Sequence, residues 1–140
     1  MLQYLKELSD FGLLILIWLV QLIIYPSFTY MEKANLIAWH PKYTTMISVV
    51  VMPLMLFQLA STFYLTYTQF NYLVLTQSIL IILLWVSTFA QAVPLHNQID
   101  TGVEIKKATI NLVQVNWKRA FMWSLIVILN FIGRFTTLNN

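Results

Sequence analysis

The chain has 140 residues, of which 59% are hydrophobic and only 9% are charged, whereas soluble domains carry roughly 25% charged residues. It contains no cysteine, and its formal net charge is +3. The composition excludes an ordinary soluble domain, and the lack of cysteine excludes disulfides, thiolate metal sites and thiol nucleophiles. The basic residues lie beside apolar runs, which is typical of membrane topology determinants rather than of nucleic-acid binding.

Long runs with few or no charged residues predict four membrane-spanning helices, at about 11–28, 44–66, 72–95 and 119–138. About 20 apolar residues cross a hydrocarbon core of ~30 Å, and backbone polar groups in lipid must be satisfied within the segment. The predicted fold class is therefore all-α, an integral-membrane four-helix bundle with antiparallel neighbouring helices. The spans use most of the chain, so we expect a single transmembrane domain over residues 1–140.

The first span is expected to begin after Ser9 or Asp10, because either side chain can cap a helix start, and to end near Tyr25 and Pro26. No small-x-small cleavage pattern follows this span, so we expect it to be retained. A polar connector over residues 29–43 leads to the second span.

The second and third spans are joined by the short uncharged sequence TYTQFN, which favours an antiparallel hairpin. The third span is expected to end at Pro94, because proline removes a backbone hydrogen bond inside a helix. In the connector 97–118 apolar residues recur at helical spacing and continue to Arg119. We therefore expect one long last helix that begins outside the bilayer and enters it.

The distribution of lysine and arginine predicts the orientation. The connectors 29–43 and 97–118 hold five basic residues and Arg119 follows directly, which makes six, whereas the opposite side holds Lys6 and Arg134. The positive-inside rule then places both connectors in the cytoplasm and both termini outside.

Each predicted helix carries polar or aromatic residues on one face, and such faces turn inward in lipid. The four stripes are Trp18, Gln21 and Tyr25; Met52 or Met55 with Gln58; Trp85, Thr88, Ala92 and His96; and Arg119, Trp123, Val127 and Asn130. Two interpretations stay open: the stripes bond the helices to one another, or they line a binding site.

The predicted topology places two histidines, His40 and His96, on the same face of the membrane. Neutral imidazoles ligate transition metals or haem iron, and they transfer protons near neutral pH. The alternative is that each histidine ends a helix and bonds to backbone or lipid headgroups. The candidate site consists of His40 and His96 as possible metal or haem ligands, with Tyr25, Glu32, Asn97, Asn116 and Arg119 as polar support.

Several chemistries are excluded by the sequence. The three glycines are isolated, so there is no nucleotide-binding loop, and no HExxH motif or nucleophile elbow occurs. All five carboxylates, Asp10 among them, are expected outside the spans. Proton-coupled transport through an intramembrane carboxylate is therefore not expected.

The motifs YP (25–26), a histidine connector, Pro94 before His96, and NWKR (116–119) resemble those of small bacterial four-helix membrane proteins. That group is distantly similar to the anthrone-oxygenase-like family. The resemblance implies a four-helix fold in a bacterial cytoplasmic membrane and, for some members, oxidation of polycyclic aromatic substrates. Gln58 stands where the resemblance leads us to expect an acidic residue, which argues against a ligand role there.

Two functional hypotheses follow, and they leave open whether the protein is an enzyme. The first is a non-catalytic accessory subunit or binding module in the membrane. The second is an oxidoreductase or oxygenase-like enzyme that uses a histidine-lined metal or haem site on a hydrophobic substrate. The expected partners are the lipid bilayer, other membrane subunits or a hydrophobic small molecule, and not nucleic acid.

Overall fold

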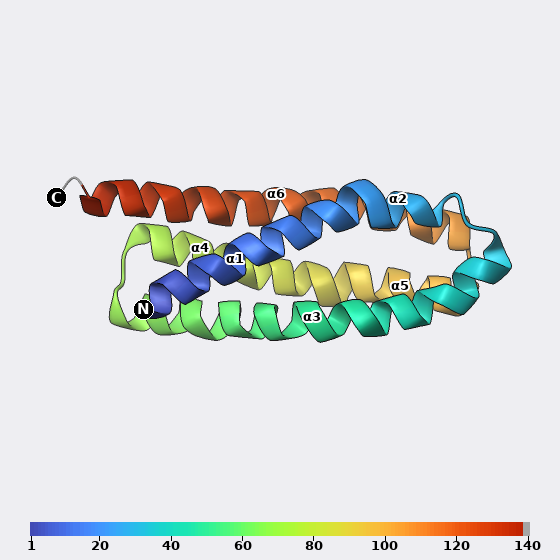
Figure 1. Ribbon diagram of the computed structural model, residues 1–140, viewed down its shortest axis with the longest axis horizontal. Coiled ribbons are helices and arrows are strands. Elements are labelled where there is room, and N and C mark those ends of the chain that lie inside the picture. The colour runs from blue at the N-terminus through green and yellow to red at the C-terminus, as the bar shows by residue number, and fades with distance from the viewer. Residues whose placement is uncertain (139–140) are drawn as a thin grey trace.

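In a computed structural model, residues 1–138 form four long helical segments (Figure 1). The described residues contain no strand, so the all-α fold class is confirmed. The elements are α1 (Leu2–Leu19), the π-helical turn η1 (Val20–Ile24), α2 (Tyr25–Phe28), α3 (Lys33–Thr68), α4 (Tyr72–Ser87), the π-helical turn η2 (Thr88–Ala92), α5 (Val93–Asp100) and α6 (Ile105–Leu138).

The four segments pack as antiparallel neighbours (Figure 1). The start of α1, the α3–α4 connection and the last turns of α6 lie at one end, which we call the terminal end. The connections 29–32 and 101–104 lie at the other end, which we call the loop end. Because the chain reverses three times, the relay, cavity and network described below each draw residues from segments that are distant in sequence.

All four segments are long and apolar enough to cross a membrane. Their outer surfaces carry large exposed apolar side chains, such as Val49, Phe121 and Ile128. Lipid tails are the environment that satisfies such a surface, since in water it would be a large apolar patch. The protein is therefore an integral-membrane four-helix bundle, as predicted.

Three predicted boundaries are wrong, and each is wrong because a helix is longer than expected. α1 begins at Leu2, so Ser9 and Asp10 lie inside it and cap nothing. α3 begins at Lys33, so the predicted connector 29–43 shrinks to residues 29–32. The third segment passes Pro94 and ends at Asp100. The expectation of one long last helix is confirmed by α6.

A π-helical turn explains how the first and third segments continue past a proline. The N–H of Tyr25 bonds to the carbonyl of Val20, and the N–H of Val93 bonds to the carbonyl of Thr88. Each donor immediately precedes a proline, and each bond spans five residues instead of four. The wider turn leaves room for the proline ring, which otherwise clashes with a carbonyl of the preceding turn. Both segments therefore remain helical up to the loop end.

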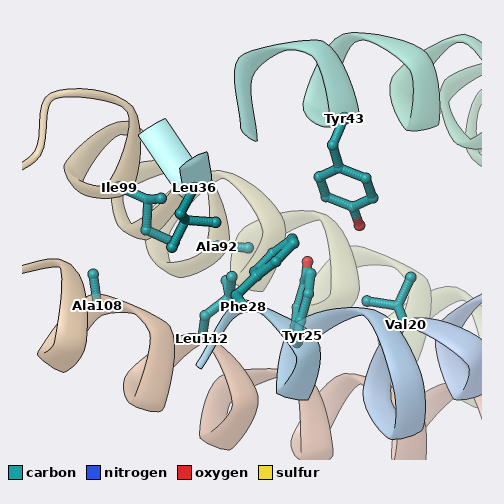
Figure 2. Close-up of a cluster of buried hydrophobic side chains, with 9 residues drawn as sticks. All are labelled: Val20, Tyr25, Phe28, Leu36, Tyr43, Ala92, Ile99, Ala108 and Leu112. Carbon is teal, nitrogen blue, oxygen red and sulfur yellow. The ribbon is translucent and has the colours of Figure 1, made fainter. Parts of the chain in front are cut away.

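The interior contains two apolar clusters. One lies toward the loop end and includes Phe28, Leu36, Ile99 and Leu112 (Figure 2). The other lies in the middle of the bundle and is centred on Leu84, Ile126 and neighbours from α1 and α3. The polar groups described below lie beside these clusters, at different depths in the bundle.

Candidate functional site

A chain of four hydrogen-bonded side chains lies near the loop end, and we call it the histidine relay. The Tyr25 hydroxyl is 3.1 Å from Nε2 of His96, and Nδ1 of His96 is 2.9 Å from Nε2 of His40. Nδ1 of His40 is 2.5 Å from Oδ1 of Asp100. The relay therefore joins α2, α5 and α3, and it begins and ends on a group that can hold or release a proton.

One arrangement of protons satisfies every link of the relay. With Asp100 ionised, Nδ1–H of His40 donates to the carboxylate, which leaves Nε2 of His40 as an acceptor. Nδ1–H of His96 then donates to His40, and Nε2 of His96 accepts from the Tyr25 hydroxyl. Every bond holds one proton and every donor faces the same way. Such an ordered chain can pass a proton from one end to the other.

Aromatic rings enclose the relay. The Phe28 ring meets the His40 ring edge-on at 5.3 Å between centroids, and the two imidazoles lie 5.0 Å apart. Figure 2 shows the hydroxyls of Tyr25 and Tyr43 directed toward the same space between α2 and α3. His40 is 0% exposed, whereas the carboxylate of Asp100 is 30% exposed. His40 is thus shielded from solvent, whereas His96 is only partly buried beside the cavity and the Asp100 end of the relay reaches solvent at the loop end.

A second polar group surrounds Arg119, whose side chain is only 6% exposed. Nη1 of Arg119 donates to Asn116 at 3.1 Å, and Nη2 donates to Thr88 at 3.3 Å. Asn116 in turn donates to Gln21 at 2.9 Å. These partners are neutral, and no ion pair of Arg119 occurs among the described residues. Nε of Arg119 has no hydrogen-bond partner at all.

A cavity of about 320 Å³ brings the two groups together. Tyr25, His96 and Asp100 of the relay line it, as does Arg119. Most of the remaining wall is apolar and comes from α1 and α3. Apolar pockets of this size with a few convergent polar groups are typical of small-molecule sites.

The mouth of the cavity lies on the side of the bundle. Among its lining residues, Ser48 of α3 is exposed, as are Phe89 and Val93 on the opposite edge. The opening therefore runs between α3 and the η2–α5 segment. A hydrophobic molecule dissolved in the bilayer can reach the cavity by this route.

Five of the seven site residues predicted from the sequence lie together in the structure. Tyr25, His40 and His96 belong to the relay, and Asn116 and Arg119 meet beside it. Glu32 and Asn97 do not join them. Glu32 is exposed at the start of α3, with no capping hydrogen bond from its side chain. Asn97 is exposed at the edge of the cavity.

The predicted role of the histidines as metal or haem ligands finds little support in this geometry. All four imidazole nitrogens take part in hydrogen bonds of the relay. Among residues 1–138, no three histidine or carboxylate side chains are grouped so that they could hold a metal ion. The geometry favours proton transfer, because ligation would require the relay to be broken.

Sequence reasoning missed Asp100, although it lies one helical turn after His96. That spacing places Asp100 beside His96 only if the helix continues past Pro94, and the sequence predicted that the helix ends there. Tyr43 and the inward position of Trp123 beside Arg119 also contribute to the site. Trp123 was placed on an inward stripe, and its burial to 1% exposure confirms that placement.

The expectation that every carboxylate lies outside the spans is also wrong. Asp10 is 0% exposed inside the bundle, where its carboxylate pairs with Lys6 at 2.8 Å. Gln58 donates to Asp10 at 2.8 Å, and Asn130 donates to it at the same distance. Gln77 accepts from Lys6 at 2.8 Å. We call these five residues the charge network; it lies toward the terminal end, away from the relay.

No family model, curated protein or solved structure matches this chain. The resemblance to the anthrone-oxygenase-like family therefore stays a prediction.

Proposed function

We propose that the protein is a small membrane enzyme that holds a hydrophobic molecule in the cavity and exchanges a proton with it. The observation that carries this proposal is the histidine relay, which links a hydroxyl on the cavity wall to a partly exposed carboxylate. Amides and hydroxyls suffice to bond helices in a membrane. Four proton-exchanging groups joined end to end are instead typical of acid–base catalysis.

The relay moves one proton without leaving a charge on its inner members. The Tyr25 oxygen takes a proton from the bound molecule while its own proton passes to Nε2 of His96. The Nδ1 proton of His96 passes to His40, and the Nδ1 proton of His40 passes to Asp100. The bound molecule has then lost one proton and Asp100 has gained one. The reverse sequence returns a proton to the molecule, so the same relay serves as acid or base.

Deuterium labelling tests this proposal. The protein in lipid nanodiscs is incubated in D₂O with a total lipid extract, and the extract is then searched by mass spectrometry. We expect one component to exchange carbon-bound hydrogen for deuterium with wild-type protein but not with Tyr25→Phe. Tyr30→Phe is the matched control, because Tyr30 is exposed and lies outside the relay. Equal labelling by Tyr25→Phe would contradict the proposal.

A non-catalytic binding module is the second candidate, and the buried Arg119 beside an apolar cavity supports it. In the labelling experiment, such a module binds a component of the extract and leaves its mass unchanged. The accessory-subunit version requires a second chain that copurifies in mild detergent. A stable monomer without a copurifying chain argues against it.

The oxidoreductase or oxygenase-like hypothesis requires a haem or transition metal in addition to proton transfer. An absorption spectrum and a metal analysis of the purified protein test it directly. If neither group is found at a stoichiometric level, the hypothesis fails, whereas the proton-transfer proposal does not depend on the result.

We also propose that the loop end faces the cytoplasm of a bacterial cell. The bias of lysine and arginine toward this end supports that orientation. Lys6 is weaker support for it than the sequence suggested, because its ammonium is buried in the charge network. Labelling of single cysteines at Tyr30 and Tyr67, from each side of the membrane, tests the orientation.

A further inference from the structure

We infer that the molecule held in the cavity is a hydrophobic organic oxyanion, and that Arg119 binds its charged oxygen. This inference rests on the proposed function in one respect, namely that the cavity is where the molecule binds. It adds the chemical class of that molecule. Arg119 is not a member of the histidine relay, although its guanidinium lies close enough to the Tyr25 hydroxyl to interact with it. The enzyme proposal depends on Tyr25 and the two histidines, whereas this inference depends on Arg119.

Arg119 is a buried cation on the cavity wall. Arginine remains protonated in proteins, and a cation inside a membrane bundle is costly unless an anion accompanies it. The described partners of Arg119 are the neutral side chains of Asn116 and Thr88. Lys6, the other deeply buried cation, is paired with Asp10 at 2.8 Å. Arg119 thus lacks the counter-charge that the same bundle supplies to Lys6.

Hydrogen-bond donors without acceptors lie beside the cavity. A guanidinium has five N–H groups, and the two hydrogen bonds of Arg119 use two of them. Nε of Arg119 and Nε1 of Trp123 are both buried without a partner, and both residues line the cavity. The Arg119 guanidinium lies 5.5 Å from the centre of the Trp123 ring. Neighbouring donors without acceptors suit an oxygen that carries negative charge.

Most of the remaining cavity wall is apolar. The same cavity is lined by the apolar side chains of Leu13, Ile17, Val51 and Met55. A small hydrophilic anion would lose its hydration there without compensation. A molecule with an apolar body and one oxyanion satisfies both surfaces. A free organic acid and an anionic phospholipid share this chemistry.

Binding of radiolabelled decanoate tests the inference without any need for turnover. Protein in phosphatidylcholine nanodiscs is compared with empty nanodiscs, and decanol and decylammonium replace decanoate as neutral and cationic probes. We expect wild-type protein to bind decanoate at least about tenfold more tightly than either probe. The preference should persist at high salt, because a buried pair is screened less than a surface pair. Equal affinity for decanoate and decanol overturns the inference, and this comparison needs no variant.

Variants then assign the preference to Arg119. Arg119→Gln should remove the preference for decanoate, and Arg119→Lys should retain part of it. Lys118→Gln, a change at the exposed neighbour, should leave the preference intact. A decanoate preference that survives in folded Arg119→Gln protein, as checked by size-exclusion chromatography and thermal melting, contradicts the assignment.

Two further arms separate the possible sources and the two proposals. Displacement of decanoate by phosphatidylglycerol in the nanodisc identifies a lipid phosphate as the anion, and a lack of displacement identifies a free organic acid. Selective binding of decanoate by the wild-type protein, without deuterium exchange in any lipid component, would refute the proposed enzyme function and leave this inference standing.

Discussion

The bundle buries charged groups in two regions. They differ in how many of their hydrogen-bond donors and acceptors have partners. In the charge network, all three N–H groups of Lys6 have acceptors, and both oxygens of Asp10 have donors. At the Arg119 cavity, a buried cation lacks an anion and retains unused donors. The first region holds helices together, whereas the second has bonding capacity left for a ligand. Burial alone does not distinguish them.

The presence of a cavity does not distinguish them either. A space of about 450 Å³ at the terminal end is lined by Lys6, Gln77 and Asn130. The donors of Lys6 are already occupied there, and in the network only Oε1 of Gln58 is buried without a partner. We therefore assign stability to the charge network and binding to the Arg119 cavity. The predictions below separate the two.

The largest expected effect is a loss of stability on replacing Asp10. Asp10→Leu should lower the free energy of unfolding by about 3–5 kcal/mol, because it leaves the ammonium of Lys6 buried without its carboxylate. Thermal unfolding in detergent micelles measures the change. The double variant Lys6→Met with Asp10→Leu should recover most of the loss. Equal instability of the single and double variants would show that the ion pair is not the cause.

The next effect is on the reaction and not on the fold. His40→Gln should slow deuterium exchange by about 100-fold, because an amide in the middle of the relay cannot pass a proton on. The glutamine still fills part of the space beside Phe28, so unfolding should change much less than in Asp10→Leu. An unchanged exchange rate in folded His40→Gln protein would remove His40 from the mechanism.

Gln77→Leu provides the opposite pattern. The change removes an acceptor of Lys6 and a donor to Asn130, so we expect the free energy of unfolding to fall by about 1–3 kcal/mol. The rate of deuterium exchange and the affinity for decanoate should stay at wild-type values. If either of them fell, the two regions would be coupled, and the separation drawn above would be wrong.

The smallest expected effect on stability follows from Asp100→Asn. The amide oxygen can still accept from Nδ1 of His40, and the Asp100 side chain is partly exposed, so melting should hardly change. The amide cannot take up the proton that leaves His40, so deuterium exchange should slow by about 100-fold, as in His40→Gln. Exchange at the wild-type rate in folded Asp100→Asn protein would show that Asp100 is not the proton acceptor of the relay.

The sequence was sufficient to predict the fold class, the inward helix faces and the placement of His40 and His96 at the same end of the bundle, but it left open whether the two histidines meet. Apolar run length and helical spacing depend only on local residue types, so they can be derived from one chain. Gln21, Gln58 and Trp123, which lie on the predicted stripes, are indeed buried.

The missed features depend on contacts between distant segments. Asp10 was interpreted as a cap because its side chain can bond to the first turn of a helix, yet it lies inside the bundle, where partners from α3 and α6 bond to its carboxylate. Pro94 was interpreted as a helix end because proline breaks a regular α-helix, but the preceding π turn accommodates it. Whether such a local rule holds at a given residue depends on packing between distant segments, which the residue types alone do not reveal.

The unequal exposure of the two ends of the relay has an electrical consequence. Tyr25 is deep in the bundle at 4% exposure, whereas Asp100 meets solvent at the loop end. In the proposed reaction, each transferred proton would therefore carry a positive charge through part of the membrane field, and a complete crossing is worth about 2.3 kcal/mol per 100 mV. With the loop end in the cytoplasm, an inside-negative voltage draws that proton away from the bound molecule. The state of charge of the cell membrane would then set how readily the ligand ionises.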